Sequence, residues 1–183
     1  ALDLLRRLPA APPPPDGIAV VGMAASYADA ADLDAVWAAL DAGRECFRAA
    51  PNDRWPDAPP VAVRGGFLPD ADRFDPAFFR LSVTEAAMTD PQQRVFLEQA
   101  FHALEHAGYA AAELAGARCG VFVGSGAGDY AQRLSRAGVG PEPTALIGNV
   151  PSILAARLAY FLNLKGPAVA VDTACSSSLV AVH

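Results

Sequence analysis

One cysteine in this chain lies where a side chain could act as a nucleophile. Cys175 stands between a short apolar run, residues 168–171, and a segment that opens with Ser176 and continues with apolar residues. The first run predicts a buried strand and the second a helix, which puts Cys175 at or beside a helix start. Unpaired N–H groups and the positive end of the helix dipole meet there, and they stabilise a thiolate or an oxyanion. The pattern therefore predicts a nucleophile, and the alternative is a small buried core residue.

The other cysteines lack this setting. Cys46 and Cys119 have no predicted helix start or general base beside them, and we interpret both as core or loop thiols. Three widely spaced cysteines without a CxxC pair argue against a zinc site or a disulfide framework, and reduced thiols fit a cytoplasmic protein. Ser125 is not predicted to be a nucleophile, because Val123 holds the first glycine position of a G-x-S-x-G elbow.

None of the three histidines is placed to serve as the base for Cys175. His183 lies eight residues beyond it on the same predicted helix, about 12 Å along the axis, whereas hydrogen-bond reach is about 3 Å. His102 and His106 share a helix face with Glu98, and a metal site is the alternative interpretation. Because there is no HExxH pattern and no third ligand is implied, we predict structural histidines and no metal.

Two further patterns could indicate ligand binding. Residues 124–129 resemble a dinucleotide loop after a strand, but Asp129 takes the sixth position and no clear helix is predicted directly after it. We therefore predict no nucleotide site and no directly bound cofactor. Trp37 and Trp55 are interpreted as packing residues rather than as stacking platforms.

Composition excludes several classes of protein. The chain has 183 residues, of which 52% are hydrophobic and 19% charged, so it is long and apolar enough for one core. A net charge of −6 gives no basic footprint for nucleic acid. No apolar run approaches the roughly 18 residues that span a bilayer, and Arg6 and Arg7 precede prolines rather than the apolar core of a signal peptide.

Residues 1–16 are predicted to be a Pro-rich leader or linker. Pro12 to Pro15 stop any helix and favour a stiff spacer, which suits attachment to an upstream domain, and a disordered tail is the alternative. A chain that begins with alanine is expected to be a piece of a longer polypeptide.

The first globular segment predicts a strand, a helix and an irregular excursion. Residues 18–21 are an apolar run typical of a buried strand. Asp32 as N-cap, apolar residues at helical spacing and Gly43 as C′ residue predict a helix over 33–42. Residues 44–76 are rich in Pro, Asp and Arg and predict an excursion that contains a short strand.

The strongest helix signal follows. Asp90 as N-cap, Pro91 at N1, Gln93 as the partner in a capping box and Gly108 at the end predict a helix between them. Its wide apolar face predicts burial between layers.

Three elements complete the prediction. We expect a buried strand at 119–123, a second one at 168–171, and between them a helix over 152–163 that buries Ile153, Leu154, Leu158 and Phe161. Residues 129–150 give no clear pattern. This alternation of strands and helices predicts an α/β layered domain.

Six segments in order resemble landmarks of β-ketoacyl synthase (ketosynthase) domains, and the last resembles those of modular polyketide synthases. They lie within residues 17–183 and are Ile18-Ala-Val-Val-Gly-Met23, Gly65-Gly-Phe-Leu68, Phe74-Asp-Pro-Ala-Phe-Phe79, Asp90-Pro-Gln-Gln-Arg94, Gly120-Val-Phe-Val-Gly124 and Asp172-Thr-Ala-Cys-Ser-Ser-Ser-Leu-Val-Ala-Val-His183. The resemblance implies a thiolase-like layered αβαβα fold, of which residues 17–183 supply the N-terminal half, truncated just after the nucleophile.

The resemblance also implies an acyltransferase reaction. Cys175 would take an acyl chain as a thioester, and the family's two catalytic histidines and assisting lysine would lie in the missing half, so this fragment alone is expected to be inactive. Expected partners are an acyl carrier protein bearing phosphopantetheine, the remaining half, neighbouring synthase domains and a second copy in a homodimer. This sequence departs from the family at Ser26-Tyr-Ala-Asp29 and at Thr89, neither of which touches the nucleophile.

Three other functions remain as alternatives. The domain could transfer or gate acyl chains without elongating them, if its second half lacks a catalytic histidine. It could be a non-catalytic scaffold or dimerisation module, against which the presence of Cys175 argues. It could be a cysteine hydrolase, which would need a histidine base that the residues here do not provide.

Overall fold

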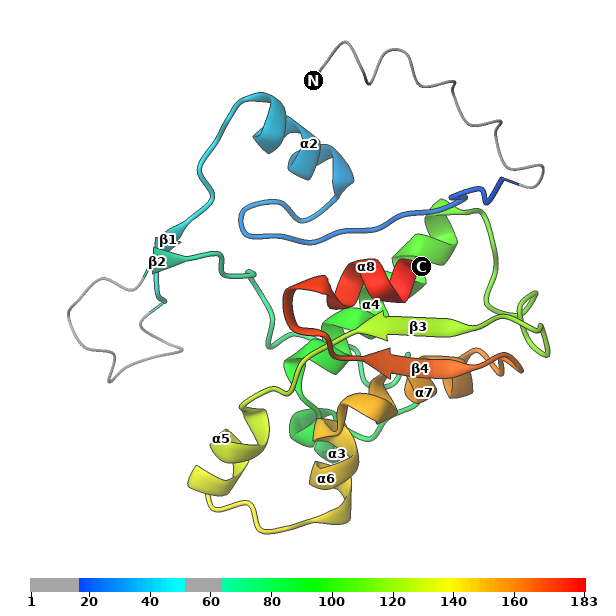
Figure 1. Cartoon of the computed structure of the whole chain (residues 1–183). Helices are drawn as coiled ribbons and strands as arrows, with labels where there is room; N and C mark the ends of the chain where they lie inside the picture. Colours follow the sequence, from blue (N-terminus) through cyan, green and yellow to red (C-terminus); the bar gives the residue numbers. More distant parts are fainter. Residues whose placement is uncertain (1–16, 52–63) are drawn as a thin grey trace, which may run out of the picture.

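The computed structural model describes residues 17–51 and 64–183 (Figure 1). The predictions for the leader, residues 1–16, and for Trp55 lie outside the described residues.

A pair of parallel strands forms the centre of the fold. Strand β3 (Val121–Gly124) pairs with β4 (Ala168–Val171) in a register that matches Val121 with Ala168 and Gly124 with Val171. Helix α7 (Pro151–Phe161), which connects them, and helix α8 (Ser177–Val182), which follows β4, lie on opposite sides of the pair (Figure 1). This arrangement confirms the predicted α/β layers. The strand predicted at 168–171 is formed, but its predicted burial is wrong: no residue of β4 is fully buried, because within the described residues only β3 lies beside it in the sheet.

The core lies between β3 and the helices on the α7 side. Val121 and Val123 point into it, whereas Phe122 between them is exposed, so β3 is buried on one face only. The buried residues that form this core are Phe79, Leu97, Val121, Val123, Leu154, Ala155, Leu158 and Leu162. Leu154 and Leu158 are thus buried as predicted, while Ile153 and Phe161 are only partly buried.

Helix α4 (Pro91–His106) confirms most of its sequence signals. The Asp90 side chain accepts a hydrogen bond from the Gln92 N–H at 2.8 Å, Pro91 stands in the first turn, and Gly108 has φ +79° after the last turn. The predicted capping box is wrong. The Asp90 N–H donates to the Gly148 carbonyl, and the Gln93 side-chain amide donates to the Val150 carbonyl. Both donors therefore bond to the junction between α6 (Pro143–Asn149) and α7 rather than to each other's residue.

Helix α2 (Leu33–Asp41) begins and ends as predicted. Asp32 caps it by accepting from the Ala35 N–H at 2.8 Å, and Gly43 follows with φ +59°. Trp37 is 70% exposed, so its interpretation as a packing residue is wrong in this structure. The excursion contains strands β1 (Arg48–Ala49) and β2 (Arg64–Gly65), which pair antiparallel as a minimal ladder.

Three short helices were not predicted. They are α3 (Val83–Met88), α5 (Tyr130–Arg136) and α6 (Pro143–Asn149). Each is too short for its apolar spacing to stand out from a loop. Helix α5 opens directly after residues 124–129, which corrects the expectation that no helix follows that loop. Thr89, fully buried, donates its hydroxyl to the Glu85 carbonyl at 2.8 Å and so closes α3.

The predicted buried strand at residues 18–21 is not formed. The segment is extended but has no ladder partner within the described ranges, and Ile18 is 98% exposed. A strand needs a neighbouring strand to satisfy its N–H and C=O groups, and within the described residues β3 and β4 pair only with each other and not with this segment. The segment instead contacts α4, where a Cβ on Gly22 would overlap Ala103 and Ala107.

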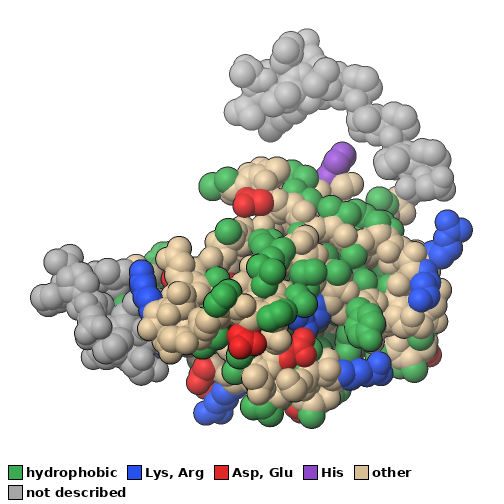
Figure 2. All heavy atoms as spheres, turned by 90° about the horizontal axis from the view of Figure 1, so that it is seen from below, with side chains coloured by type: hydrophobic (Ala, Val, Ile, Leu, Met, Phe, Trp, Pro, Cys, Tyr) green, Lys and Arg blue, Asp and Glu red, His purple; other side chains and the backbone are tan. Residues whose placement is uncertain are grey.

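Apolar side chains are exposed on helices α3, α6 and α7 as well as in the segment at residues 18–21. The view from below shows hydrophobic groups scattered among charged ones (Figure 2). Exposed apolar residues on α3, α6 and α7 are Val83, Leu146, Ile147 and Tyr160. No single helix in the described ranges is long and apolar enough to cross a membrane; α6 and α7 together meet that test by length and composition, with a bend of 92° between them.

Candidate active site

Cys175 stands in the connection from β4 to α8. A 3₁₀ turn, Ala174–Ser176, links the strand to the helix, and Cys175 is its middle residue. Cys175 is exposed and is not one of the core residues, which argues against the alternative of a buried core cysteine. Ala174 has φ +54°, a left-handed conformation that costs a residue with a Cβ about 1–2 kcal/mol. Such local strain is typical of functional turns that the surrounding structure holds in place.

Three polar side chains hold this turn. The buried Ser177 hydroxyl accepts from the Thr173 N–H at 2.9 Å and donates to the Ala174 carbonyl at 2.7 Å. The Ser176 hydroxyl donates to the Thr173 carbonyl at 2.9 Å, and Asp172 accepts from the Ala174 N–H at 3.1 Å. The sequence placed the Ser176 and Ser177 hydroxyls in the first turn of a helix. It did not show that both bond back to residues before Cys175, namely Thr173 and Ala174. The clustering of hydroxyl side chains on both sides of the cysteine is the signal that could have indicated it.

The turn leaves the reactive groups of Cys175 free. Within residues 17–51 and 64–183, neither its thiol nor its backbone N–H has a hydrogen-bond partner. A thiolate at this position can attack an electrophilic carbonyl, and the N–H can stabilise the oxyanion that forms. The arrangement can therefore carry out acyl transfer to sulfur.

The glycine-rich loop after β3 packs against this turn. A Cβ on Gly124 would lie 2.6 Å from the backbone of Ser177, and a Cβ on Gly128 would overlap the Asp90 carboxylate. The Ser125 N–H donates to the Val171 carbonyl at 3.0 Å. Close packing between α4 and the Cys175 segment thus accounts for these glycines, and nothing in their contacts points to a nucleotide.

The histidines lie away from the thiol or in structural contacts. His106 accepts from the Met23 N–H at 3.1 Å, and His102 lies 2.9 Å from Glu105. Burial raises the pKa of the Glu98 carboxyl, although His102 and Arg94 lower it. Among the described residues no cluster of three or more His, Cys, Asp or Glu side chains could hold a metal. His183 is exposed and follows the last turn of α8.

The other two thiols make only backbone contacts. Cys46, half-buried, donates to the Arg44 carbonyl at 3.7 Å, and Cys119, exposed in the loop before β3, donates to the Gly120 carbonyl at 3.6 Å. Both residues lie outside helices and strands, which fits their interpretation as core or loop thiols.

Removing the Ser177 hydroxyl is expected to slow acylation of Cys175. Ser177→Ala leaves the Thr173 N–H and the Ala174 carbonyl without their partner, which costs about 1–3 kcal/mol for a buried group and loosens the turn. We expect the acylation rate, followed by intact mass, to fall about tenfold because the nucleophile is less well oriented.

Two variants serve as controls for this prediction. Ser177→Thr keeps a hydroxyl and should restore most of the rate, and Ser178→Ala alters an exposed neighbour and should match the unmodified protein. Equal rates for Ser177→Ala and Ser178→Ala would contradict a role for Ser177 in holding the turn.

Comparisons with known proteins agree with one another. The family model described as "Beta-ketoacyl synthase, N-terminal domain" matches residues 16–183. The chain is 42% identical over 180 residues to polyketide synthase PksN of Bacillus subtilis (strain 168), covering 92% of this chain and 3% of that synthase. It is 42% identical over 190 residues to the spectinabilin polyketide synthase system protein NorC of Streptomyces orinoci, covering 96% of this chain and 8% of that protein.

Solved structures give the same likeness. The ketosynthase from module 6 of the bacillaene synthase of Bacillus subtilis 168 matches with a TM-score of 0.80 and 42% identity, over 92% of this chain and 28% of that one. The oxazolomycin ketosynthase domain OzmH KS7 of Streptomyces albus JA3453 matches with a TM-score of 0.79 and 40% identity, over 92% of this chain and 31% of that one. The chain thus spans less than a third of each.

Proposed function

The chain belongs to the β-ketoacyl synthase family and has its thiolase-like α/β fold, and from this premise we propose that Cys175 is the acylation site of a polyketide synthase ketosynthase. The observation that supports the proposal is the exposed Cys175 thiol beside its own unpaired N–H, in a turn fixed by Ser177. The presence of the thiol argues against a scaffold, and no observation favours the non-elongating or hydrolase alternatives.

In the first half-reaction the Cys175 thiolate attacks an acyl thioester. The donor is an acyl chain on the phosphopantetheine arm of an acyl carrier protein. A bond forms between the Cys175 sulfur and the acyl carbon, the bond to the pantetheine sulfur breaks, and the pantetheine thiolate leaves and takes up a proton. The N–H of Cys175 donates to the tetrahedral oxyanion in between.

In the second half-reaction a malonyl-type extender on a carrier protein loses CO₂. The resulting carbanion attacks the Cys175 thioester, a carbon–carbon bond forms, and the cysteine leaves as a thiolate. Histidine side chains to assist this step would come from the remainder of a ketosynthase, because His183 caps the far end of α8, whereas Cys175 lies in the turn before its start.

The proposed partners follow from the chemistry of the reaction and from the family resemblance. They are the acyl carrier protein, the remainder of the ketosynthase, neighbouring synthase domains and a second copy. By analogy with the family, we place β4 close to the two-fold axis of that dimer. Val169 of β4 and Val180 of α8 are exposed apolar side chains at this end of the structure and leave room for such contacts. A cytoplasmic location remains a prediction from the reduced cysteines.

The test uses the polypeptide that carries this chain together with the rest of a ketosynthase. Incubation with an acyl-pantetheine thioester and then with a malonyl carrier protein is expected to give CO₂ and a β-ketoacyl product on the carrier. A Cys175 acyl adduct without CO₂ release would identify a non-elongating enzyme, and free acid in place of the product would identify a hydrolase. Light scattering of the same protein reports whether it is a dimer.

A further inference from the structure

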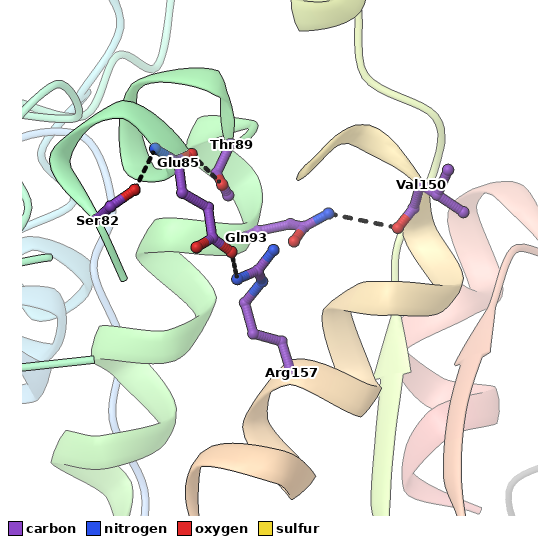
Figure 3. Close-up of polar contacts among 6 residues, drawn as sticks. All are labelled: Ser82, Glu85, Thr89, Gln93, Val150 and Arg157. Atoms are coloured by element: carbon purple, nitrogen blue, oxygen red, sulfur yellow. Dashed lines mark hydrogen bonds and ion pairs between the residues drawn. The ribbon is translucent and has the colours of Figure 1, made fainter. Parts of the chain in front are cut away.

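A polar cluster that is largely hidden from solvent joins helices α3, α4 and α7. It consists of Glu85 on α3, Gln93 on α4 and Arg157 on α7 (Figure 3). Arg157 Nη1 lies 2.8 Å from Glu85 Oε1, and its side chain is only 11% exposed. Gln93 is 3% exposed. Groups so deeply buried need hydrogen-bond partners, since an unpaired one is destabilising.

The amide of Gln93 has a fixed orientation. Its Nε2 donates to the Val150 carbonyl at 3.3 Å, which directs Oε1 toward Arg157 (Figure 3). Gln93 Oε1 and the Nε and Nη2 atoms of Arg157 are all buried, and none has a hydrogen-bond partner within the described residues. The two side chains point toward one another, so an unpaired acceptor on Gln93 faces the side chain that carries two unpaired donors (Figure 3).

Gln93 also belongs to a set of bonds that holds the start of α4. The junction of α3 and α4 is tied to the junction of α6 and α7 at three points. The Asn149 amide donates to the Met88 carbonyl at 2.9 Å, the Asp90 N–H donates to the Gly148 carbonyl at 2.9 Å, and Gln93 donates to Val150. Of these three bonds, the one from Gln93 comes from the side chain whose Oε1 points toward Arg157 (Figure 3).

The start of α4 in turn supports the nucleophile turn. Asp90 lies against Gly128, at the end of the glycine-rich loop, and Gly124, at the other end, lies against Ser177. The loop is thus packed between the α4 cap and the residues that hold Cys175, so a shift of α4 would reach the turn through the Asp90 side chain on one side and the Ser177 backbone on the other.

We propose that Arg157 and Gln93 are positioning residues for acylation of Cys175. The facing polar groups of Arg157 and Gln93 couple the two side chains, which together fix the first turn of α4. Helix α4 in turn fixes the loop on which the Cys175 turn rests. The inference rests on the proposed function, because it concerns the rate at which Cys175 accepts an acyl group.

The test is a double-mutant cycle in the complete ketosynthase, with Arg157→Met, Gln93→Met and both together. The maximal acylation rate constant, the KM for acyl-pantetheine and the urea midpoint are measured for each. We expect each single variant to lower the maximal rate about tenfold with KM within about twofold, because binding contacts are untouched. The double variant should be no more than about twofold slower than the slower single, since coupled residues are not additive.

Conservative variants separate positioning from stability alone. Gln93→Glu keeps an acceptor toward Arg157 but loses the donor to the Val150 carbonyl, and Arg157→Lys keeps a charge for Glu85 but lacks the second donor. Both variants should fold and should still lower the maximal rate several-fold. The control is Arg73→Met, which breaks an exposed ion pair with Asp70 and should change nothing. Should the methionine variants fail to fold, Gln93→Glu and Arg157→Lys decide the question.

The outcomes are distinct. Lower urea midpoints with unchanged maximal rates, or multiplicative losses in the double variant, would overturn the inference and leave the proposed function standing. An unmodified enzyme that takes no acyl group at Cys175 would overturn the proposed function, and the inference with it.

Discussion

Cys175→Ala is expected to abolish acylation of the complete ketosynthase. The sulfur forms the covalent bond to the acyl chain, so the rate should fall by at least about 10⁴-fold, as is typical when a nucleophile is removed. Intact-mass analysis after incubation with an acyl-pantetheine thioester should show a single adduct that maps to Cys175 in the unmodified protein, and none in the variant.

The other two cysteines provide matched controls for this result. Cys46→Ala and Cys119→Ala should acylate at the unmodified rate, because each thiol contacts only a neighbouring backbone carbonyl. Cys119 is the more demanding control, since it is exposed as Cys175 is. An adduct that persists in Cys175→Ala and maps to Cys46 or Cys119 would refute the assignment.

The second large effect concerns folding. Residues 1–183 expressed alone are expected to show no cooperative melt above about 45 °C, the lower end for ordinary domains. Leu179 is 74% exposed on α8, and each large apolar side chain left in water forfeits about 1.5–3 kcal/mol. A few such residues rival a whole domain's stability of about 5–15 kcal/mol. The exposed apolar residues at this end and in the extended segment are Ile18, Val20, Val21, Leu179, Val180 and Val182.

One substitution makes this prediction quantitative. Leu179→Ala should cost about 2–5 kcal/mol in the complete ketosynthase, where we expect the remainder to cover α8. Circular dichroism melts of that protein, with and without the substitution, measure the loss, and the same melts of residues 1–183 alone test for the absence of a cooperative transition. The same short protein should release no CO₂ from malonyl carrier protein. A cooperative melt in the monomeric short protein would contradict the folding prediction, and turnover that depends on Cys175 would contradict its inactivity.

Local sequence signals predicted the boundaries of α2 and α4 correctly, because in both helices a capping residue and an apolar stripe coincide. The Asp32 and Asp90 side chains cap α2 and α4, and Gly43 and Gly108 follow them with positive φ, because these features depend on residues within one turn of each other. The strand at 168–171 and the turn at Cys175 were predicted for the same reason.

Features that depend on distant residues were missed. The strand expected at 18–21 has the right composition but no pairing neighbour among the described residues, and pairing is a long-range property. Gln93 was predicted to close a capping box, yet its amide bonds to Val150, 57 positions away. The short helices α3, α5 and α6 are stabilised by packing rather than by their own periodicity, so single-sequence patterns do not reveal them.

The sequence by itself determined that Cys175 follows a strand and opens a helix, since a strand, a corner and a helix start are written in consecutive residues. Only the tertiary structure decided that the thiol is exposed, that the glycine-rich loop supports the turn, and that Arg157 faces Gln93. The reason is physical: secondary structure follows from interactions within a few residues. The burial of a side chain and the partner of a polar atom depend instead on which surfaces meet when helices far apart in the chain pack together.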